Sequence, residues 1–196
     1  MKKTILLPIV TILLVAAILL GSSFLLNNIA AEKAQAEHLA MMQMLLPGSQ
    51  QFTLETNTGS DEIIRSVHKG ENGFVIETVT NGYAGSITML IGVNTQGRVT
   101  GLVVQDMQET FGLGANALND HVFLSQFLNI DGTFAVGTGE DAFSGATGTA
   151  DSDADTYVDA ITGATVTSKA IVRCVNAAVA YVTGADIESG ATSWGG

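Results

Sequence analysis

One stretch of the chain combines small residues and hydroxyl side chains with the expected start of a helix. It reads Asp159-Ala-Ile-Thr-Gly-Ala-Thr-Val-Thr-Ser-Lys-Ala170, and the apolar spacing that follows predicts a helix over about 168–182. Thr165, Thr167 and Ser168 therefore gather hydroxyl and backbone N–H groups at a helix N-terminus, where the positive end of the helix dipole attracts an anion such as phosphate. An ordinary cap by Thr167 or Ser168 explains the same residues, and both interpretations stay open at this point.

A second stretch, Glu109-Thr-Phe-Gly-Leu-Gly114, follows directly after an expected strand. Its two glycines on either side of Leu113 allow positive φ angles and let the backbone approach a ligand closely. A plain turn between a strand and a helix explains the pair of glycines equally well.

A partial copy of the first stretch lies at Asp141-Ala-Phe-Ser-Gly-Ala-Thr-Gly-Thr149, with Thr147 where the first stretch has Thr165. Its continuation contains Gly148 and several aspartates, which do not start a stable helix. These aspartates repel an anion, and no helix dipole offsets them. Thr165 is therefore the preferred anion-binding position of the two.

The elements that must position these stretches are those of an α+β domain with an antiparallel sheet and packed helices. Alternating apolar residues predict strands, and Asn94-Thr-Gln-Gly97 predicts a hairpin turn. The last helix is expected to bury five residues, among them Cys174 as a small apolar core side chain: Ala170, Ile171, Cys174, Ala178 and Val182. The expected elements are a helix at 28–46, strands at 73–80, 86–93 and 98–104, a helix at 115–130, a long loop at 131–158 and the last helix.

The N-terminal part carries an apolar run of 22 residues, from 5 to 26, without an ionisable side chain. As a helix it extends about 33 Å, enough for a hydrocarbon core of roughly 30 Å. The run is longer than the core of a cleavable signal peptide, so a transmembrane anchor is expected. Lys2 and Lys3 place residues 1–4 in the cytoplasm and the remainder outside. The expected order is completed by a juxtamembrane helix at 27–47, a domain at 48–183 and a flexible tail at 184–196.

Composition excludes several classes of function. The formal charge is −11, so phosphate-mediated nucleic-acid binding is not expected. The lone cysteine excludes an intrachain disulfide framework and a multi-cysteine metal cluster. The three histidines are scattered along the chain, and no metal site is assigned.

Four segments together resemble the bacterial FMN-binding domain family. Thr162-Gly-Ala-Thr165, with Asp159 before it and Val166-Thr-Ser168 after it, resembles the family's flavinylation motif. The other three segments are Asn81-Gly-Tyr-Ala-Gly-Ser-Ile87, Gly92-Val-Asn-Thr-Gln-Gly97 and Glu109–Ala115. Phe111 departs from the family, which commonly has proline there. The spacing is most similar to that of the G subunits of Rnf-type electron-transport complexes.

The resemblance implies one covalent FMN per chain, joined through a phosphoester to Thr165 by a separate flavin transferase that recognises the segment at Asp159. It implies that Lys169 assists the phosphate, that Leu113 covers a face of the ring, and that the two motifs supply the other cofactor-binding residues. These residues are Thr162, Gly163, Ala164, Thr167, Ser168, Glu109, Thr110, Gly112 and Gly114.

The implied function is electron relay by a membrane-anchored flavoprotein subunit of a ferredoxin:NAD-type, redox-driven, ion-translocating complex. Its implied partners are the other subunits of that complex. The chemistry is the cofactor's, and the protein fixes its position and potential. Three alternatives are a stand-alone extracytoplasmic flavoprotein, the C subunit of a sodium-pumping NADH:quinone reductase, and a non-redox tethered binding module.

Overall fold

The computed structural model describes residues 29–30, 32–56, 61–108, 121–137 and 154–184. They belong to two compact units, residues 1–41 and residues 42–196. Within the described ranges, no helix is both long enough and apolar enough to cross a bilayer. The expected span at 5–26 lies outside these ranges, and so does the tail beyond Gly184.

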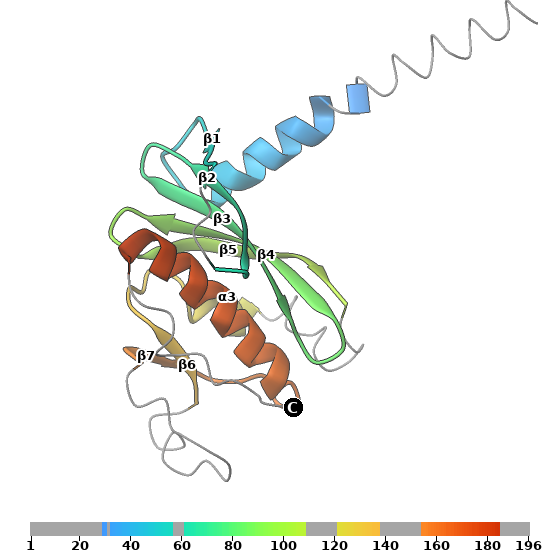
Figure 1. The fold of residues 1–196 in the computed structure, drawn as a ribbon, viewed down its shortest axis with the longest axis vertical. Helices are drawn as coiled ribbons and strands as arrows, with labels where there is room; N and C mark the ends of the chain where they lie inside the picture. The colour runs from blue at the N-terminus through green and yellow to red at the C-terminus, as the bar shows by residue number, and fades with distance from the viewer. Residues whose placement is uncertain (1–28, 31, 57–60, 109–120, 138–153, 185–196) are drawn as a thin grey trace, which may run out of the picture. The chain divides into compact units, whose positions relative to one another are not determined.

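A five-stranded antiparallel sheet forms the centre of the second unit (Figure 1). Its strands are neighbours in chain order, as short hairpin connections require. They are β1 (Thr53–Leu54), β2 (Ile64–Lys69), β3 (Gly73–Asn81), β4 (Ser86–Asn94) and β5 (Val99–Met107). The α+β class with an antiparallel sheet is thereby confirmed. β3, β4 and β5 match three expected strands to within a few residues, whereas β1 and β2 were not predicted.

One face of this sheet packs against α3 (Thr165–Thr183), which Figure 1 shows lying across the strands. The period-two residues of β4 point to this face and have no exposed surface: Ile87, Met89, Ile91 and Val93. The face of α3 that was expected to be apolar packs against these β4 residues. Ile171, Cys174 and Ala178 on this face are fully buried. Burying aliphatic side chains contributes roughly 1.5–3 kcal/mol for each large one, so this layer is the main core.

The C-terminal end of a helix at residues 32–45 packs on the opposite face of the sheet. The hydroxyl of Thr100 donates to the carbonyl oxygen of Leu45 at 2.6 Å. Leu45 and Leu46 are buried, and the second compact unit begins at Met42. The last turn of this helix is therefore part of the domain.

The region between β5 and α3 differs from the prediction. The expected helix at 115–130 is described only from residue 121, where α2 (His121–Ser125) is followed by turns. Phe123 and Phe127 are buried, whereas Val122 is 78% exposed. The expected loop at 131–158 contains a parallel pair of short strands, β6 (Phe134–Val136) and β7 (Thr156–Val158).

Candidate functional site

A tight turn leads into α3. The N–H of Ala164 donates to the carbonyl oxygen of Ile161 at 2.9 Å, and Gly163, between them, has a φ of 77°. A positive φ at the third position is the requirement of a type II turn, and glycine meets it without strain. The helix then begins at Thr165, three residues earlier than predicted, with Ala164 as its N-cap residue.

The two other hydroxyl residues of the motif are buried. Thr167 and Ser168 have 1% and 0% of their surface exposed. The Ser168 hydroxyl accepts from the N–H of Ile161 at 3.1 Å and donates to the carbonyl oxygen of Ala164 at 3.0 Å. No side chain caps the helix, so the alternative that Thr167 or Ser168 serves as its cap does not hold. Ser168 instead fixes the turn against the first turn of α3.

Thr165 is exposed on the first residue of α3, and Thr162 and Gly163 are exposed in the turn before it. The first N–H groups of an α-helix have no partner inside the helix, and here no side-chain cap supplies one. The first turn also contains no acidic residue, although the chain has 19 acids and 8 Lys and Arg residues. This end of α3 is therefore suited to an anion attached at Thr165.

Gln126 holds the segment that precedes the turn. Its side-chain oxygen accepts from the N–H of Asp159 at 2.8 Å, and its side-chain nitrogen donates to the carbonyl oxygen of Asp159 at 3.3 Å. A primary amide can pair in this way with both groups of one residue because it carries an acceptor and donors side by side. The Asp159 residue is exposed, so its carboxylate is accessible to a protein that recognises this segment.

The β3–β4 hairpin, which contains the segment at 81–87, is bonded both to α3 and to the end of β5. Arg173 of α3 donates from Nη2 to the carbonyl oxygen of Asn81 at 3.1 Å, where β3 ends. The N–H of Gln108 donates to the carbonyl oxygen of Ser86 at 3.1 Å, at the start of β4. The chain thus enters the second motif beside this hairpin. The residues expected there, and the second threonine candidate, lie outside the described part of the chain: Glu109, Thr110, Gly112, Leu113, Gly114 and Thr147.

Cys174 lies inside the core rather than at the site. Burial raises the pKa of its thiol to about 11, and the nearby Thr78 hydroxyl and Arg173 charge offset this only in part. A thiol that stays protonated is a poor nucleophile and metal ligand. In the described ranges, no group of three or more His, Cys, Asp and Glu side chains is placed to hold a metal ion.

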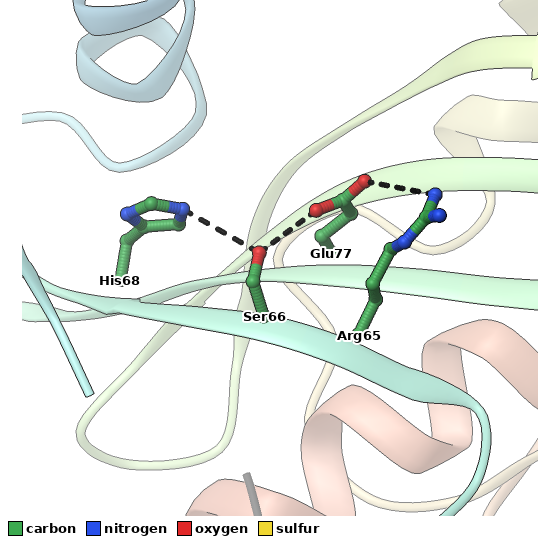
Figure 2. Close-up of polar contacts among 4 residues, drawn as sticks. All are labelled: Arg65, Ser66, His68 and Glu77. Carbon is green, nitrogen blue, oxygen red and sulfur yellow. Dashed lines mark hydrogen bonds and ion pairs between the residues drawn. The ribbon is translucent and has the colours of Figure 1, made fainter. Parts of the chain in front are cut away.

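A serine, a histidine and a glutamate do lie together on β2 and β3, as Figure 2 shows. Ser66 donates to Glu77 at 2.8 Å, while its oxygen is 3.5 Å from Nε2 of His68. The other Glu77 oxygen lies 3.8 Å from Arg65. In a nucleophilic triad the histidine lies between the serine and the carboxylate and binds both. Here the serine lies between the other two, so the cluster is a polar link between neighbouring strands.

The sequence did not indicate Gln126, Arg173 or Asn176 as residues that position the site. Asn176 donates to the carbonyl oxygen of Phe134 at 2.8 Å and accepts from its N–H at 2.9 Å, so it joins α3 to β6. Each of these bonds connects residues more than 30 positions apart in the chain. No local pattern marks such a partner.

The chain is similar to several known proteins. The family model described as FMN-binding domain matches residues 82–180. The chain is 28% identical to the G subunit of the ion-translocating oxidoreductase complex of Pseudomonas aeruginosa (strain UCBPP-PA14), over 92% of this chain and 87% of that protein. It is also 28% identical to the G subunit of the proton-translocating ferredoxin:NAD(+) oxidoreductase complex of Clostridium ljungdahlii, over 82% of this chain and 80% of that protein. The Na(+)-translocating counterpart of Acetobacterium woodii is 32% identical over 55% of this chain and 47% of that protein.

Proposed function

The chain belongs to the FMN-binding domain family, and from this premise we propose that it is the G subunit of a membrane-bound, ion-translocating electron-transport complex, with FMN joined covalently to Thr165. The relatives that match most of the chain carry such names. One observation supports the position of the cofactor above all others. Thr165 is exposed at the first position of α3, where N–H groups without a side-chain cap favour the binding of a phosphate.

The transfer of FMN from FAD to Thr165 balances in atoms and charge. The Thr165 hydroxyl oxygen bonds to the phosphorus on the FMN side, the phosphoanhydride bond breaks, AMP leaves and one proton is released. The phosphodiester that results keeps one negative charge, which the helix N-terminus stabilises by about 0.3–1 kcal/mol. Lys169, exposed one turn further along α3, adds a positive charge on the same side. A flavin transferase carries out the step and recognises the segment at Asp159.

When FMN is bound, it supplies the redox chemistry: it takes electrons from one membrane subunit and passes them to the next. The chain's own residues hold it in place. The turn at 161–164, fixed by Ser168 and Gln126, positions Thr165, and we assign the segment at 109–114 to the wall of the ring site, with Leu113 on its face. Thr162 and Gly163, which are exposed, complete the surroundings of the phosphate, whereas the buried Ala164 and Thr167 support the turn from the inside.

The proposal includes a place in the cell. The apolar run at 5–26 anchors the chain, residues 1–4 lie in the cytoplasm, and the domain lies outside. There a covalent link keeps the cofactor from being lost by dissociation. The complex moves electrons between ferredoxin and NAD and couples them to ion movement. Its ion path belongs to partner subunits, because the apolar run contains no ionisable residue.

The test is covalent flavin on the denatured protein. We expect the full chain, expressed with a flavin transferase, to fluoresce in a denaturing gel and to gain the mass of one FMN less one water. Thr165→Ala should lose both signals, and Thr147→Ala should keep them. Fluorescence that survives Thr165→Ala but not Thr147→Ala would move the site. Material of bare polypeptide mass would overturn the assignment altogether.

Membership of the complex is tested separately. We expect the full chain, affinity-purified from solubilised native membranes, to bring other redox subunits with it. If it is purified alone while still carrying covalent FMN, the stand-alone flavoprotein is the correct alternative.

A further inference from the structure

Arg173 is not fully satisfied by the protein around it. Its Nη2 donates to the carbonyl oxygen of Asn81 at 3.1 Å. Its Nε atom is buried and has no hydrogen-bond partner in the part of the chain that the structure describes. A guanidinium carries five N–H donors, and burying one without an acceptor is unfavourable. Such an orphaned donor calls for a ligand or another acceptor.

The position of Arg173 on α3 relates it to the attachment site. Thr165, Lys169 and Arg173 recur at intervals of four residues, so they follow one side of the helix. Thr165 and Lys169 are exposed and Arg173 is half-buried, whereas Thr167 and Ser168 point inward. At 1.5 Å per residue, Arg173 lies about 12 Å along the axis from Thr165. A flavin tethered through its phosphate would carry its ring away from the tether by the length of the ribityl chain, and the side of α3 that holds Arg173 is within such a reach.

One segment that resembles the family contacts Arg173, and the chain enters another from the neighbouring strand. Asn81, which Arg173 contacts, ends β3, and the hairpin is closed by a bond of 2.8 Å from the N–H of Gly82 to the carbonyl oxygen of Gly85. Gln108, which bonds to the start of β4, leads into the segment assigned to the ring wall. In Figure 1 this hairpin lies beside the N-terminal half of α3.

The positive charge of Arg173 also has no acidic partner among the described residues, in a chain with more than twice as many acids as Lys and Arg residues. A flavin ring that takes up two electrons and one proton gains one net negative charge. We propose that Arg173 contacts this ring and stabilises the charge, which raises the reduction potential of the flavin. This inference rests on the proposed attachment at Thr165.

The test is a spectroelectrochemical titration of the covalent flavoprotein, with dithionite as reductant. Arg173→Gln removes the charge and should weaken the preference for the reduced ring about tenfold. For a two-electron couple this lowers the midpoint potential by about 30 mV. Arg173→Lys keeps the charge and should retain most of the wild-type potential.

The matched control is Arg98→Gln, which also removes one positive charge. Arg98 follows the β4–β5 turn, at the far end of β4 from Asn81, about 27 Å away along the strand. The added Cβ of a substituted Gly97 would meet Thr183 at 2.4 Å, so this turn lies at the C-terminal end of α3. Such a distance exceeds the screening length of about 10 Å at moderate salt, and the potential should not change.

The outcomes separate the two proposals. Absence of covalent flavin from the wild-type protein contradicts the attachment at Thr165. Covalent flavin whose potential is the same in Arg173→Gln and wild type contradicts the role of Arg173 alone. An equal fall in Arg173→Gln and Arg173→Lys would assign the effect to the bond with Asn81 rather than to charge, and would also overturn the inference.

Discussion

Hydroxyl residues in one short motif have different tasks. Thr165 is exposed at the start of α3, whereas the Ser168 hydroxyl is buried and bonded to both ends of the preceding turn. A buried hydroxyl with a donor and an acceptor already in place is not available to a ligand. Ser168 therefore acts by holding the backbone that presents Thr165.

The turn depends on Gly163. Its φ of 77° costs a residue with a Cβ about 1–2 kcal/mol. We expect Gly163→Ala to lower the free energy of unfolding by about this amount and to reduce the yield of covalent flavin. Gly163→Asn should be milder, because asparagine tolerates this region. Urea unfolding and gel fluorescence measure the two effects, and equal stability of Gly163→Ala and wild type would contradict the argument.

Asp155 gives a pH dependence that can be assigned to one carboxylate. It accepts from the N–H and the hydroxyl of Thr133 at 2.8 and 3.0 Å, and these bonds lower its pKa below the ordinary 3.8. A lowered pKa in the folded state stabilises the protein above the unfolded-state value, and this stability is lost as pH falls through the folded value.

We therefore expect Asp155→Asn to be less stable than wild type near neutral pH by about 0.5 kcal/mol or less, because Asp155 is exposed and solvent screens its charge. The difference should shrink below pH 3.8 as Asp155 itself becomes protonated. Urea unfolding of both proteins across this pH range measures it. A difference that is constant with pH would show that the charge of Asp155 plays no part.

At the scale of elements, α3 connects the sheet to the smaller β6–β7 pair. Its apolar side packs on the five-stranded sheet, and Asn176 bonds to both backbone groups of Phe134 in β6. The amide side chain thus takes the place of a neighbouring strand. This explains how a strand pair of three residues each is held in place without a larger sheet around it.

The contact between the sheet and the end of the helix at 32–45 requires glycine. A Cβ added at Gly92 would lie 2.1 Å from the carbonyl oxygen of Leu45, which is backbone and does not move aside easily. We expect Gly92→Ala to cost at least about 3 kcal/mol.

The matched control is Gly184→Ala at the end of α3. There a Cβ meets nothing within 4 Å, and only the φ of 70° opposes it, at a cost of about 1 kcal/mol. Chemical denaturation of the two variants compares the costs. If Gly92→Ala were as mild as Gly184→Ala, the close packing at Leu45 would be wrong.

Prediction of elements succeeded where a pattern was long. β3, β4 and β5 each have nine residues, and alternation along β4 identified its buried side. β6 and β7 have three residues each and depend on partners far away in the chain, so no local period marks them. The helix expected at 115–130 ends at Ser125 instead, and turns follow it.

At the scale of the whole molecule, the segments at 81–87 and 162–168 lie toward the N-terminal part of α3, whereas the segment at 92–97 lies at its C-terminal end. Arg173 joins the helix to the β3–β4 hairpin, and Gln108 brings the end of β5 to the same hairpin. Gln126 ties the segment before Thr165 to the turn after α2. Four separate stretches of chain thus converge, and the function we propose depends on the whole domain being folded.

Cys174 reports on that global fold. It lies on the buried face of α3, and its thiol has a pKa of about 11 instead of 9.0. We expect slow alkylation of the native protein at about pH 8 and complete alkylation in strong denaturant, because the reactive thiolate forms only once the core opens.

Because folding raises the pKa of the Cys174 thiol, this thiol contributes to stability below pH 9.0, and the contribution is lost as pH rises through about 11.

Intact-mass analysis of alkylated protein measures the rate at which Cys174 is alkylated, with Cys174→Ser as the unreactive control. Rapid labelling of the native protein would show that the core is open at this helix.

The sequence alone determined the α+β class, the long strands, the buried side of the last helix and the motif around Thr165, because each is a local pattern of polarity or residue type. Tertiary structure decided which hydroxyls are exposed, where α3 begins and which residues fix the site. Gln126, Arg173 and Asn176 acquire their partners only when distant segments pack together, and a hydrogen bond between distant residues leaves no period in the chain.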